Sequence, residues 1–214
     1  MIITKKLDSQ IERHKYLIKI IKDKFPNKEI NIIDIGCGQA NLAKLLRAEG
    51  YEKIVGIDKL ELNKVKNIDY LQKYHNLDIE LENFITDKKF DLIICSEVIE
   101  HLNNTQKILK LMKNLLNDNG IIILTVPNNS NIFSRFYFCW KGMLKRYPVE
   151  KKNSYSHITI ILKENLMSFL NRIDMKIVQI LGGKIFFKNF CIFPNKYFSY
   201  FWSYDVVYII KKNS

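Results

Sequence analysis

The sequence predicts an α/β fold in which helices cover both faces of a largely parallel sheet. Two observations lead to this prediction. Short runs rich in Ile, Leu and Val recur along the chain, and amphipathic helical patterns separate them. The first run, at residues 30–35, breaks abruptly into Asp34-Ile35-Gly36-Cys37-Gly38 and then into a helical pattern. Because parallel strands must be joined by a crossover, usually a helix, this alternation indicates a parallel sheet.

The expected elements can be placed in order along the chain. An amphipathic helix at residues 9–24, where Ile and Leu alternate with charges, ends before Pro26. We assign residues 74–77, which end at Asp78, to the third strand. After residue 126 an aromatic and basic segment interrupts the alternation. Strands are expected at 30–35, 53–57, 74–77, 90–95, 120–126, 176–181 and 204–211, and further helices at 42–48, 60–70, 105–116 and 163–172.

Length and composition indicate a single domain over residues 1–214. A chain of this length can bury a large core without disulfides or metal ions. The four cysteines are scattered singly and no secretory leader is evident, so we expect reduced thiols and a cytoplasmic protein. No uncharged apolar run reaches the length of about 18 residues typical of a transmembrane helix. The sequence carries no signal for an oligomeric state.

The net charge of +12 has two explanations. It could serve a polyanionic partner, either a nucleic acid or an anionic membrane surface. The lysines are spread along a chain that is rich in Ile, Lys and Asn throughout, which also fits a general compositional bias.

The loop after the first strand is a candidate cofactor site. Gly36 and Gly38 allow a tight turn and a close approach by a ligand, and the following helix offers free N–H groups to an anionic group. Asp58 ends the second strand, where nucleotide-binding sheets place an acid on ribose hydroxyls. The third glycine of a dinucleotide motif would fall at Asn41 and is absent, which argues against NAD or FAD. A simple strand-to-helix turn, with Asp58 capping the next helix, is the alternative.

Taken with two later segments, these residues resemble class I S-adenosylmethionine (SAM)-dependent methyltransferases. The segments span residues 90–102 and 115–128 and follow in the order found in that family. The ubiquinone-biosynthesis O-methyltransferase type is most similar, and the resemblance covers roughly residues 13–211. It implies a Rossmann-like, seven-stranded, mostly parallel sheet with helices on both faces and an antiparallel last strand.

The resemblance also implies roles in binding SAM. Gly36 and Gly38 would line the methionine part of the cofactor, Asp34 would support their loop, and Asp58 would bind the ribose. Ala40 stands where the family commonly has a third glycine.

Three more residues would complete the cofactor site by resemblance. Asp78 would reach the adenine amino group. Ser96, at the end of the fourth strand, would border the sulfonium. Arg13, on the helix before the first strand, would also contact SAM.

A divalent metal site can be read from residues 97–101. Glu97, Glu100 and His101 are spaced so that a helix leaving the fourth strand would present them on one face, where they could hold a cation. Glutamates that merely favour a first helical turn, and an isolated surface histidine, are the alternative. Ubiquinone-type O-methyltransferases and small-RNA 3′-terminal 2′-O-methyltransferases, which the chain resembles here, carry Glu-x-x-Glu-His and a distant His, and His157 matches that ligand.

The expected catalytic residues follow from this metal set. Mg²⁺ or Mn²⁺ held by Glu97, Glu100, His101 and His157 would lower the pKa of an acceptor hydroxyl and fix its direction. Without a metal ion, His101 or His157 would serve as the general base. Glu97, His101 and His157 are therefore the expected catalytic residues.

Residues 132–148, within an insertion at about 132–152, combine aromatic and basic side chains. The insertion follows the fifth strand, at the edge where open α/β sheets bind ligands. Three interpretations stay open. The segment could be a lid over the acceptor, a peripheral contact with a membrane, or a small satellite core.

We therefore expect a SAM-dependent methyltransferase that methylates a hydroxyl of a small-molecule or lipid-linked acceptor, such as a catechol, a phenol or a sugar. The common N-methylation signature, Asp/Asn-Pro-Pro-aromatic, is replaced by Cys-Ser-Glu-Val at residues 95–98. An RNA 2′-O-methyltransferase is an alternative, favoured by the basic charge but not by the scattered lysines. A non-catalytic SAM-binding module is another, and the intact Gly36, Gly38 and Asp58 argue against it.

Overall fold

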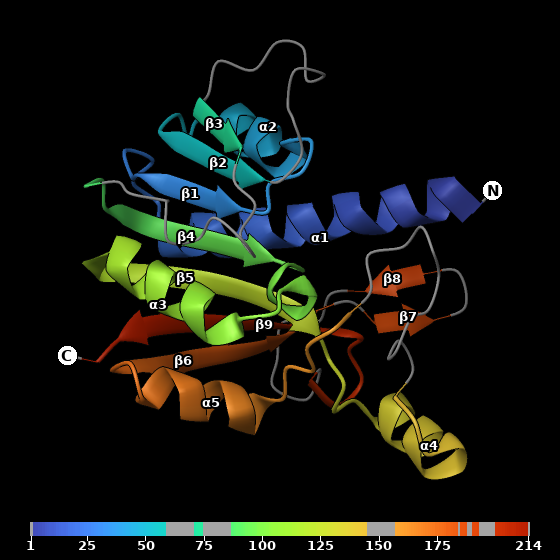
Figure 1. Ribbon diagram of the computed structural model, residues 1–214. Coiled ribbons are helices and arrows are strands. Elements are labelled where there is room, and N and C mark those ends of the chain that lie inside the picture. The colour runs from blue at the N-terminus through green and yellow to red at the C-terminus, as the bar shows by residue number, and fades with distance from the viewer. Residues whose placement is uncertain are drawn as a thin grey trace.

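The computed structural model describes residues 2–58, 71–74, 87–144, 157–183, 185–187, 190–192 and 200–213. A seven-stranded sheet forms its centre, in the order β3-β2-β1-β4-β5-β9-β6 (Figure 1). Neighbouring strands from β3 to β5 are parallel, and β9 is antiparallel to both β5 and β6. The strands are β1 Ile32–Ile35, β2 Ile54–Asp58, β3 Leu71–Tyr74, β4 Phe90–Ser96, β5 Leu116–Pro127, β6 Met175–Gly182 and β9 Asp205–Lys212. The predicted α/β fold is confirmed.

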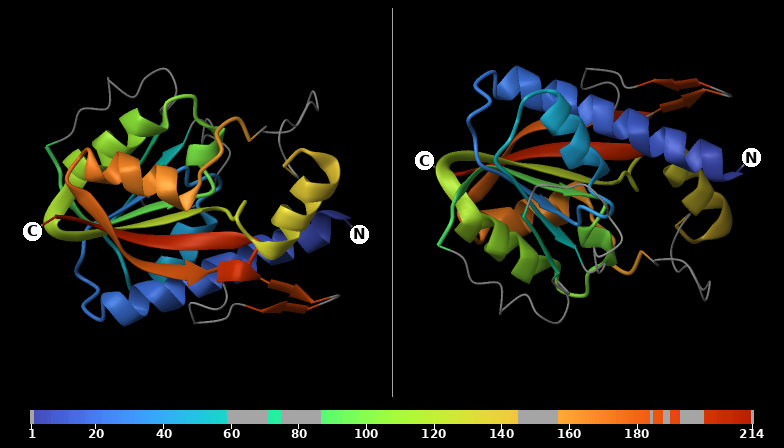
Figure 2. Two further views of the ribbon diagram at one scale, coloured as in Figure 1. Left: turned by 90° about the horizontal axis from the view of Figure 1, so that it is seen from below. Right: turned by 90° about the horizontal axis from the view of Figure 1, so that it is seen from above.

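Helices cover both faces of the sheet. The helices α1 (Ile2–Lys24) and α2 (Asn41–Ala48) lie on one face, and α3 (Thr105–Leu115) and α5 (Lys163–Asn171) lie on the other (Figure 2). Successive strand residues point to opposite faces, so Ile32 packs with the first helix pair and Ile33 with the second. Because both faces are buried, the central strands are largely apolar and do not alternate regularly between apolar and polar residues.

Two strands differ in position from the sequence-based expectation. Residues Leu71–Tyr74 form the third strand and pair with Val55–Asp58, so this strand begins three residues before the expected start at Tyr74, and residues 75–77 of the expected range lie outside the described residues. As an edge strand, β3 pairs on one side only, and its short polar run has little apolar signature. The expected helix at 60–70 and Asp78 lie outside the described residues.

Strand β5 begins at Leu116, four positions before the expected residue 120. Leu116 pairs with Phe90, but Ile121 pairs with Leu92, so residues 117–120 bulge out of the ladder. The sequence Asn-Asp-Asn-Gly is typical of a loop, and the bulge explains how it lies within a strand.

Several segments extend beyond the carboxyl ends of the parallel strands (Figure 1). Helix α4 (Ile132–Lys141) follows β5, and the hairpin of β7 (Ile185–Phe187) and β8 (Phe190–Ile192) follows β6. The sequence pattern did not assign α4 as a helix or predict the hairpin. Among the described residues, none of the helices has the length and hydropathy needed to span a bilayer.

Candidate functional site

The loop after β1 folds back on the end of β2. The backbone N–H groups of Gly36 and Cys37 donate to the carbonyl of Ile57, at 2.7 and 3.1 Å. Two residues that follow have positive φ, which is +52° at Gly38 and 60° at Ala40. Ala40 precedes α2 and makes no side-chain hydrogen bond to cap it. The loop therefore brings the amino end of α2 to the carboxyl ends of β1 and β2.

The two glycines of this loop have different tasks. A Cβ at Gly36, where φ is +78°, would lie 2.2 Å from Cγ2 of Val98, so Gly36 allows the loop to pack on the segment after β4. A Cβ at Gly38 would meet no heavy atom of the described residues within 4 Å. The described part of the chain therefore leaves room for a ligand to approach the backbone there. The sequence alone could not distinguish these two roles.

Two carboxylates lie beneath the loop. The N–H of Gly38 donates to Oδ2 of Asp58 at 2.6 Å, and Asp58 is buried. Burial, and then repulsion by Asp58, raises the pKa of Asp34 to about 7. Asp58 therefore holds the loop directly, while the raised pKa of Asp34, in the adjoining strand β1, favours its protonated form.

The end of β4 carries a chain of polar side chains that reaches α1. The hydroxyls of Ser96 and Thr125 are 2.9 Å apart, and Thr125 Oγ1 lies 3.4 Å from Oε1 of Glu97. Glu97 has a φ of 56° and pairs with Arg13, at 3.5 Å from Nη1 to Oε2. This network joins α1, β4 and β5 at one edge of the sheet. Sequence reasoning did not identify Thr125, although a polar residue inside the apolar run of β5 was a usable signal.

Three of the four predicted metal ligands lie together. Ligand atoms of Glu100, His101 and His157 all lie within 4.8 Å of one another, and the two imidazole rings meet edge to face with centroids 4.8 Å apart. The N–H groups of Ile158 and Thr159 both donate to the carbonyl of Glu100, at 2.9 and 3.0 Å. These two bonds hold the segment that begins at His157 against the turn after β4.

Glu100 is the unusual member of this cluster. Its side chain is fully buried, and neither carboxylate oxygen has a hydrogen-bond partner among the described residues. Burial, and then the charge of Glu97, raises the pKa of Glu100 well above its usual value. A buried carboxylate without a partner is costly, and a bound cation would remove that cost. The residues present therefore fit a divalent metal ion.

The local structure differs from the expected helix face. Residues Ile99–His101 form a single 3-10 turn, and Glu97 precedes it in a left-handed conformation. The chain turns sharply at Glu97, so its side chain faces Arg13 and Thr125 and does not join the other three ligands. The expectation that Glu97, Glu100 and His101 share one face assumed a regular helix after β4. This segment does not form one.

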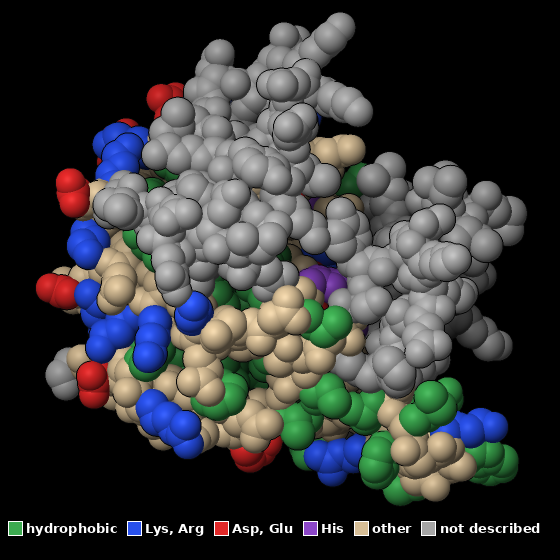
Figure 3. All heavy atoms as spheres, viewed as in Figure 1, with side chains coloured by type: hydrophobic (Ala, Val, Ile, Leu, Met, Phe, Trp, Pro, Cys, Tyr) green, Lys and Arg blue, Asp and Glu red, His purple; other side chains and the backbone are tan. Residues whose placement is uncertain are grey.

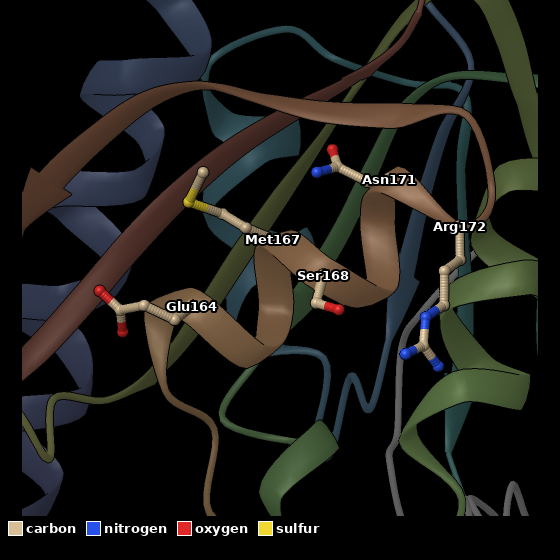
Figure 4. Close-up of a pocket in the computed structure, with 5 residues that line it drawn as sticks. All are labelled: Glu164, Met167, Ser168, Asn171 and Arg172. Carbon is tan, nitrogen blue, oxygen red and sulfur yellow. The ribbon is translucent and has the colours of Figure 1, made fainter.

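The remaining predicted features are placed as follows. Ser96 lies at the end of β4 as expected, Arg13 lies against Glu97, and Asp78 is outside the described residues. The satellite-core interpretation of the insertion was wrong for the part described, because no side chain of α4 is buried. A surface hollow elsewhere is lined, among the described residues, by α5 and by Arg172 directly after it, and these residues do not form a site between elements (Figure 4).

Comparisons with known proteins agree with this geometry. A family model described as a methyltransferase domain matches residues 9–180. The ubiquinone biosynthesis O-methyltransferase of Rickettsia akari is 27% identical over 178 residues, which cover 79% of this chain and 69% of the relative. The enzyme of the same name from Rickettsia typhi is 32% identical over 123 residues, which cover 55% of this chain and 50% of its own.

Solved structures share the fold. A SAM-dependent methyltransferase from Archaeoglobus fulgidus superposes with a TM-score of 0.64 at 19% identity, covering 96% of this chain and 98% of its own. The magnesium protoporphyrin IX methyltransferase of Synechocystis, with S-adenosylhomocysteine bound, has a TM-score of 0.61 at 13% identity, covering 96% and 84%. Since the family model spans most of the chain and the sheet, loop and strand ends agree with it, this chain belongs to the SAM-dependent methyltransferases.

Proposed function

We propose that this enzyme transfers the methyl group of SAM to a hydroxyl oxygen of a small-molecule or lipid-linked acceptor, such as a phenol, a catechol or a sugar. The observation that carries the proposal is the buried carboxyl group of Glu100, which lies beside His101 and His157 and has no hydrogen-bond partner among the described residues. A buried carboxyl group next to two imidazoles suits the binding of a cation that would activate a hydroxyl. The curated relatives are named as O-methyltransferases of ubiquinone biosynthesis, which favours a phenolic acceptor.

The donor would lie over the loop after β1. The described residues leave room above Gly38 for a ligand to reach the backbone, and Asp58 beside it would accept hydrogen bonds from ribose hydroxyls. Ser96 and Thr125, at the adjoining strand ends, would border the methyl group. Arg13, held by Glu97, would close this site from α1.

The acceptor would lie beside the cluster of Glu100, His101 and His157. A divalent ion held by these residues would lower the pKa of the acceptor hydroxyl and direct its oxygen. Two imidazoles and one carboxylate favour Mn²⁺ over Mg²⁺, because imidazole nitrogen binds transition ions more strongly. In the absence of an ion, His101 or His157 would accept the proton of the hydroxyl.

An acceptor panel tests the reaction. The protein is incubated with labelled SAM and catechols, sugar nucleotides or short RNAs, each in EDTA and after addition of Mn²⁺ or Mg²⁺. We expect label on a catechol or sugar, abolished by EDTA and restored best by Mn²⁺. Full turnover in EDTA would remove the metal ion from the proposal. Label on RNA alone would replace the small-molecule acceptor with the RNA 2′-O-methylation that the basic charge left open.

A substitution separates the metal role from folding. Glu100→Gln removes the buried charge without changing the size of the side chain, so the protein should be at least as stable as the wild type. Binding of Mn²⁺, measured by electron paramagnetic resonance on protein without SAM, should be lost. Glu164→Gln, on the surface of α5, is the matched control and should bind Mn²⁺ normally. Unchanged Mn²⁺ binding by Glu100→Gln would refute the proposed site.

A further inference from the structure

We propose that α4 and residues 200–204 form one docking surface for an anionic lipid bilayer. We name it the aromatic surface. It comprises the exposed side chains of Phe133, Phe136, Trp140, Met143, Phe201 and Trp202. Hydrophobic side chains gather over α4 and basic ones border them, at the lower right of Figure 3.

On one face of α4 the exposure of the aromatic side chains increases along the helix. Phe133, Phe136 and Trp140 are spaced to lie on one face of the helix, and their exposed fractions are 46%, 70% and 84%. A large apolar side chain left in water forgoes about 1.5–3 kcal/mol of burial. A contiguous group of such side chains on the surface indicates a binding site.

Hydrogen bonds of two asparagines attach this surface to the sheet. The amide of Asn128 donates to the carbonyls of Tyr200 and Ser203, at 2.6 and 3.1 Å. The amide of Asn131 donates to the carbonyl of Asn128 at 2.5 Å, and its carbonyl oxygen accepts from the N–H of Ser134 at 2.8 Å to cap α4. Both asparagines are buried. A buried polar joint therefore fixes the helix to the carboxyl end of β5.

Aromatic contacts join the two segments of the surface. The rings of Phe133 and Tyr204 stack with centroids 5.8 Å apart, and Phe133 meets Trp202 edge to face at 6.1 Å. The guanidinium of Arg135 lies 5.7 Å from the centre of the Phe201 ring. Segments far apart in the sequence thus form one surface, and its outer end, at Phe136 and Trp140, stays exposed.

Charge selects a lipid bilayer as the partner. Residues 132–144 contain Arg135 and Lys141 and no acidic residue, and residues 200–204 also contain none. Aromatic rings flanked by cations suit the interface of an anionic membrane, where rings enter the headgroup region and cations meet phosphates. A hydrophobic partner protein would not require this charge.

The position of the surface suits the reaction. Helix α4 lies beyond the carboxyl ends of the parallel strands, the same edge that carries Asp58, Ser96 and the Glu100 cluster (Figure 1). A bilayer bound there would present a lipid-linked acceptor to the edge that holds the site. This last step rests on the proposed function, whereas binding to the bilayer does not.

Intrinsic fluorescence gives a direct test. The chain has two tryptophans, Trp140 and Trp202, and both belong to the aromatic surface. Vesicles of phosphatidylcholine and phosphatidylglycerol should shift the emission to the blue and sediment the protein, whereas pure phosphatidylcholine should do so weakly. Each of the variants Trp140→Phe and Trp202→Phe leaves a single tryptophan, so the pair shows which position contributes to the shift in emission. An unchanged spectrum with no sedimentation would overturn the proposal.

Variants complete the experiment. Phe136→Ser/Trp140→Ser should lower partitioning onto anionic vesicles by at least about tenfold, and Lys141→Glu should weaken it on anionic vesicles only. Met167→Ser, an exposed residue of α5, is the matched control and should bind normally. Equal binding by the Phe136→Ser/Trp140→Ser variant, or concentration-dependent dimers without vesicle binding, would refute the surface. Turnover of a soluble acceptor by the same variant reports the proposed function separately.

Discussion

At the scale of single residues, Asp58 links the loop to the donor site. Its carboxylate holds the N–H of Gly38, and the proposed donor would bind beside it. Asp58→Ala should weaken SAM binding by at least about tenfold, measured by calorimetry, because a charge-assisted hydrogen bond is lost. Asp91→Ala is the control, since Asp91 holds Asn31 and Asn117 at the other end of β4. Unchanged affinity in Asp58→Ala would reject the assignment.

Asp34 should make stability depend on pH. Its pKa rises from 3.8 to about 7 on folding, so the folded state binds the proton more tightly than the unfolded chain. The free energy of unfolding should therefore decrease as pH rises from about 4 to about 7, by up to about 4 kcal/mol, and then level off. Urea denaturation of the protein without cofactor across this range measures the change.

The variant Asp34→Asn isolates this effect. Burial, and then repulsion by Arg13, lowers the pKa of His14 to about 4, which makes stability decrease as pH falls from 6.5. In the wild type, Asp34 and His14 change the free energy of unfolding with pH in opposite directions. The informative quantity is therefore the difference in the free energy of unfolding between Asp34→Asn and the wild type. This difference should grow from pH 4 to pH 7, with the variant becoming the more stable protein. A difference that does not vary with pH would contradict the prediction.

At the scale of elements, substitutions at three glycines with positive φ distinguish a role in packing from a role in binding. Gly36→Ala would place a Cβ 2.2 Å from Val98 and should cost about 2–4 kcal/mol of stability. The added Cβ of Gly38→Ala or Gly142→Ala meets no described atom within 4 Å, and each variant should cost about 1 kcal/mol. Thermal unfolding measures these costs.

The same three variants should differ in SAM affinity. Gly38→Ala fills the open space over the loop and should bind SAM at least about tenfold more weakly. Gly142→Ala changes only the end of α4 and should bind normally. Equal SAM affinity in Gly38→Ala and Gly142→Ala, measured by calorimetry, would show that the space over Gly38 does not hold the donor.

At the scale of the whole molecule, β9 closes the core between β5 and β6. It contributes buried side chains to both faces, among them Tyr208 on one and Ile209 on the other. Burying each such side chain contributes about 1.5–3 kcal/mol, and five of them approach the roughly 5–15 kcal/mol that stabilises a whole domain. The five are Val206, Val207, Tyr208, Ile209 and Ile210.

Truncation tests the role of β9. A chain that ends at residue 204 should lose cooperative unfolding, measured by circular dichroism and calorimetry. A chain that lacks only residues 213–214 loses the hydrogen bond from Asn213 to Asp174 and should unfold like the full chain. Cooperative unfolding of the shorter chain would show that the sheet is complete without its antiparallel strand.

The sequence predicted most of the fold and part of the site. Apolar periodicity located β1, β2, β4, β6 and β9 to within a few residues, because these strands are defined by local burial. It placed the starts of β3 and β5 too late along the chain, because β3 lies at the edge of the sheet and leaves little pattern, and because a bulge in β5 holds loop-forming residues within the strand. Neither feature is visible in the composition of the segment itself.

What the sequence determined by itself is the family, the fold and the loop that points to SAM, because short motifs and strand periodicity are local and appear in order along the chain. Only the tertiary structure decided which acidic residue joins His101 and His157. Glu100 does so because the chain turns at Glu97 and places that side chain against Arg13. The structure also decided that α4 is exposed. Both outcomes depend on contacts between segments far apart in the chain, which no local pattern records.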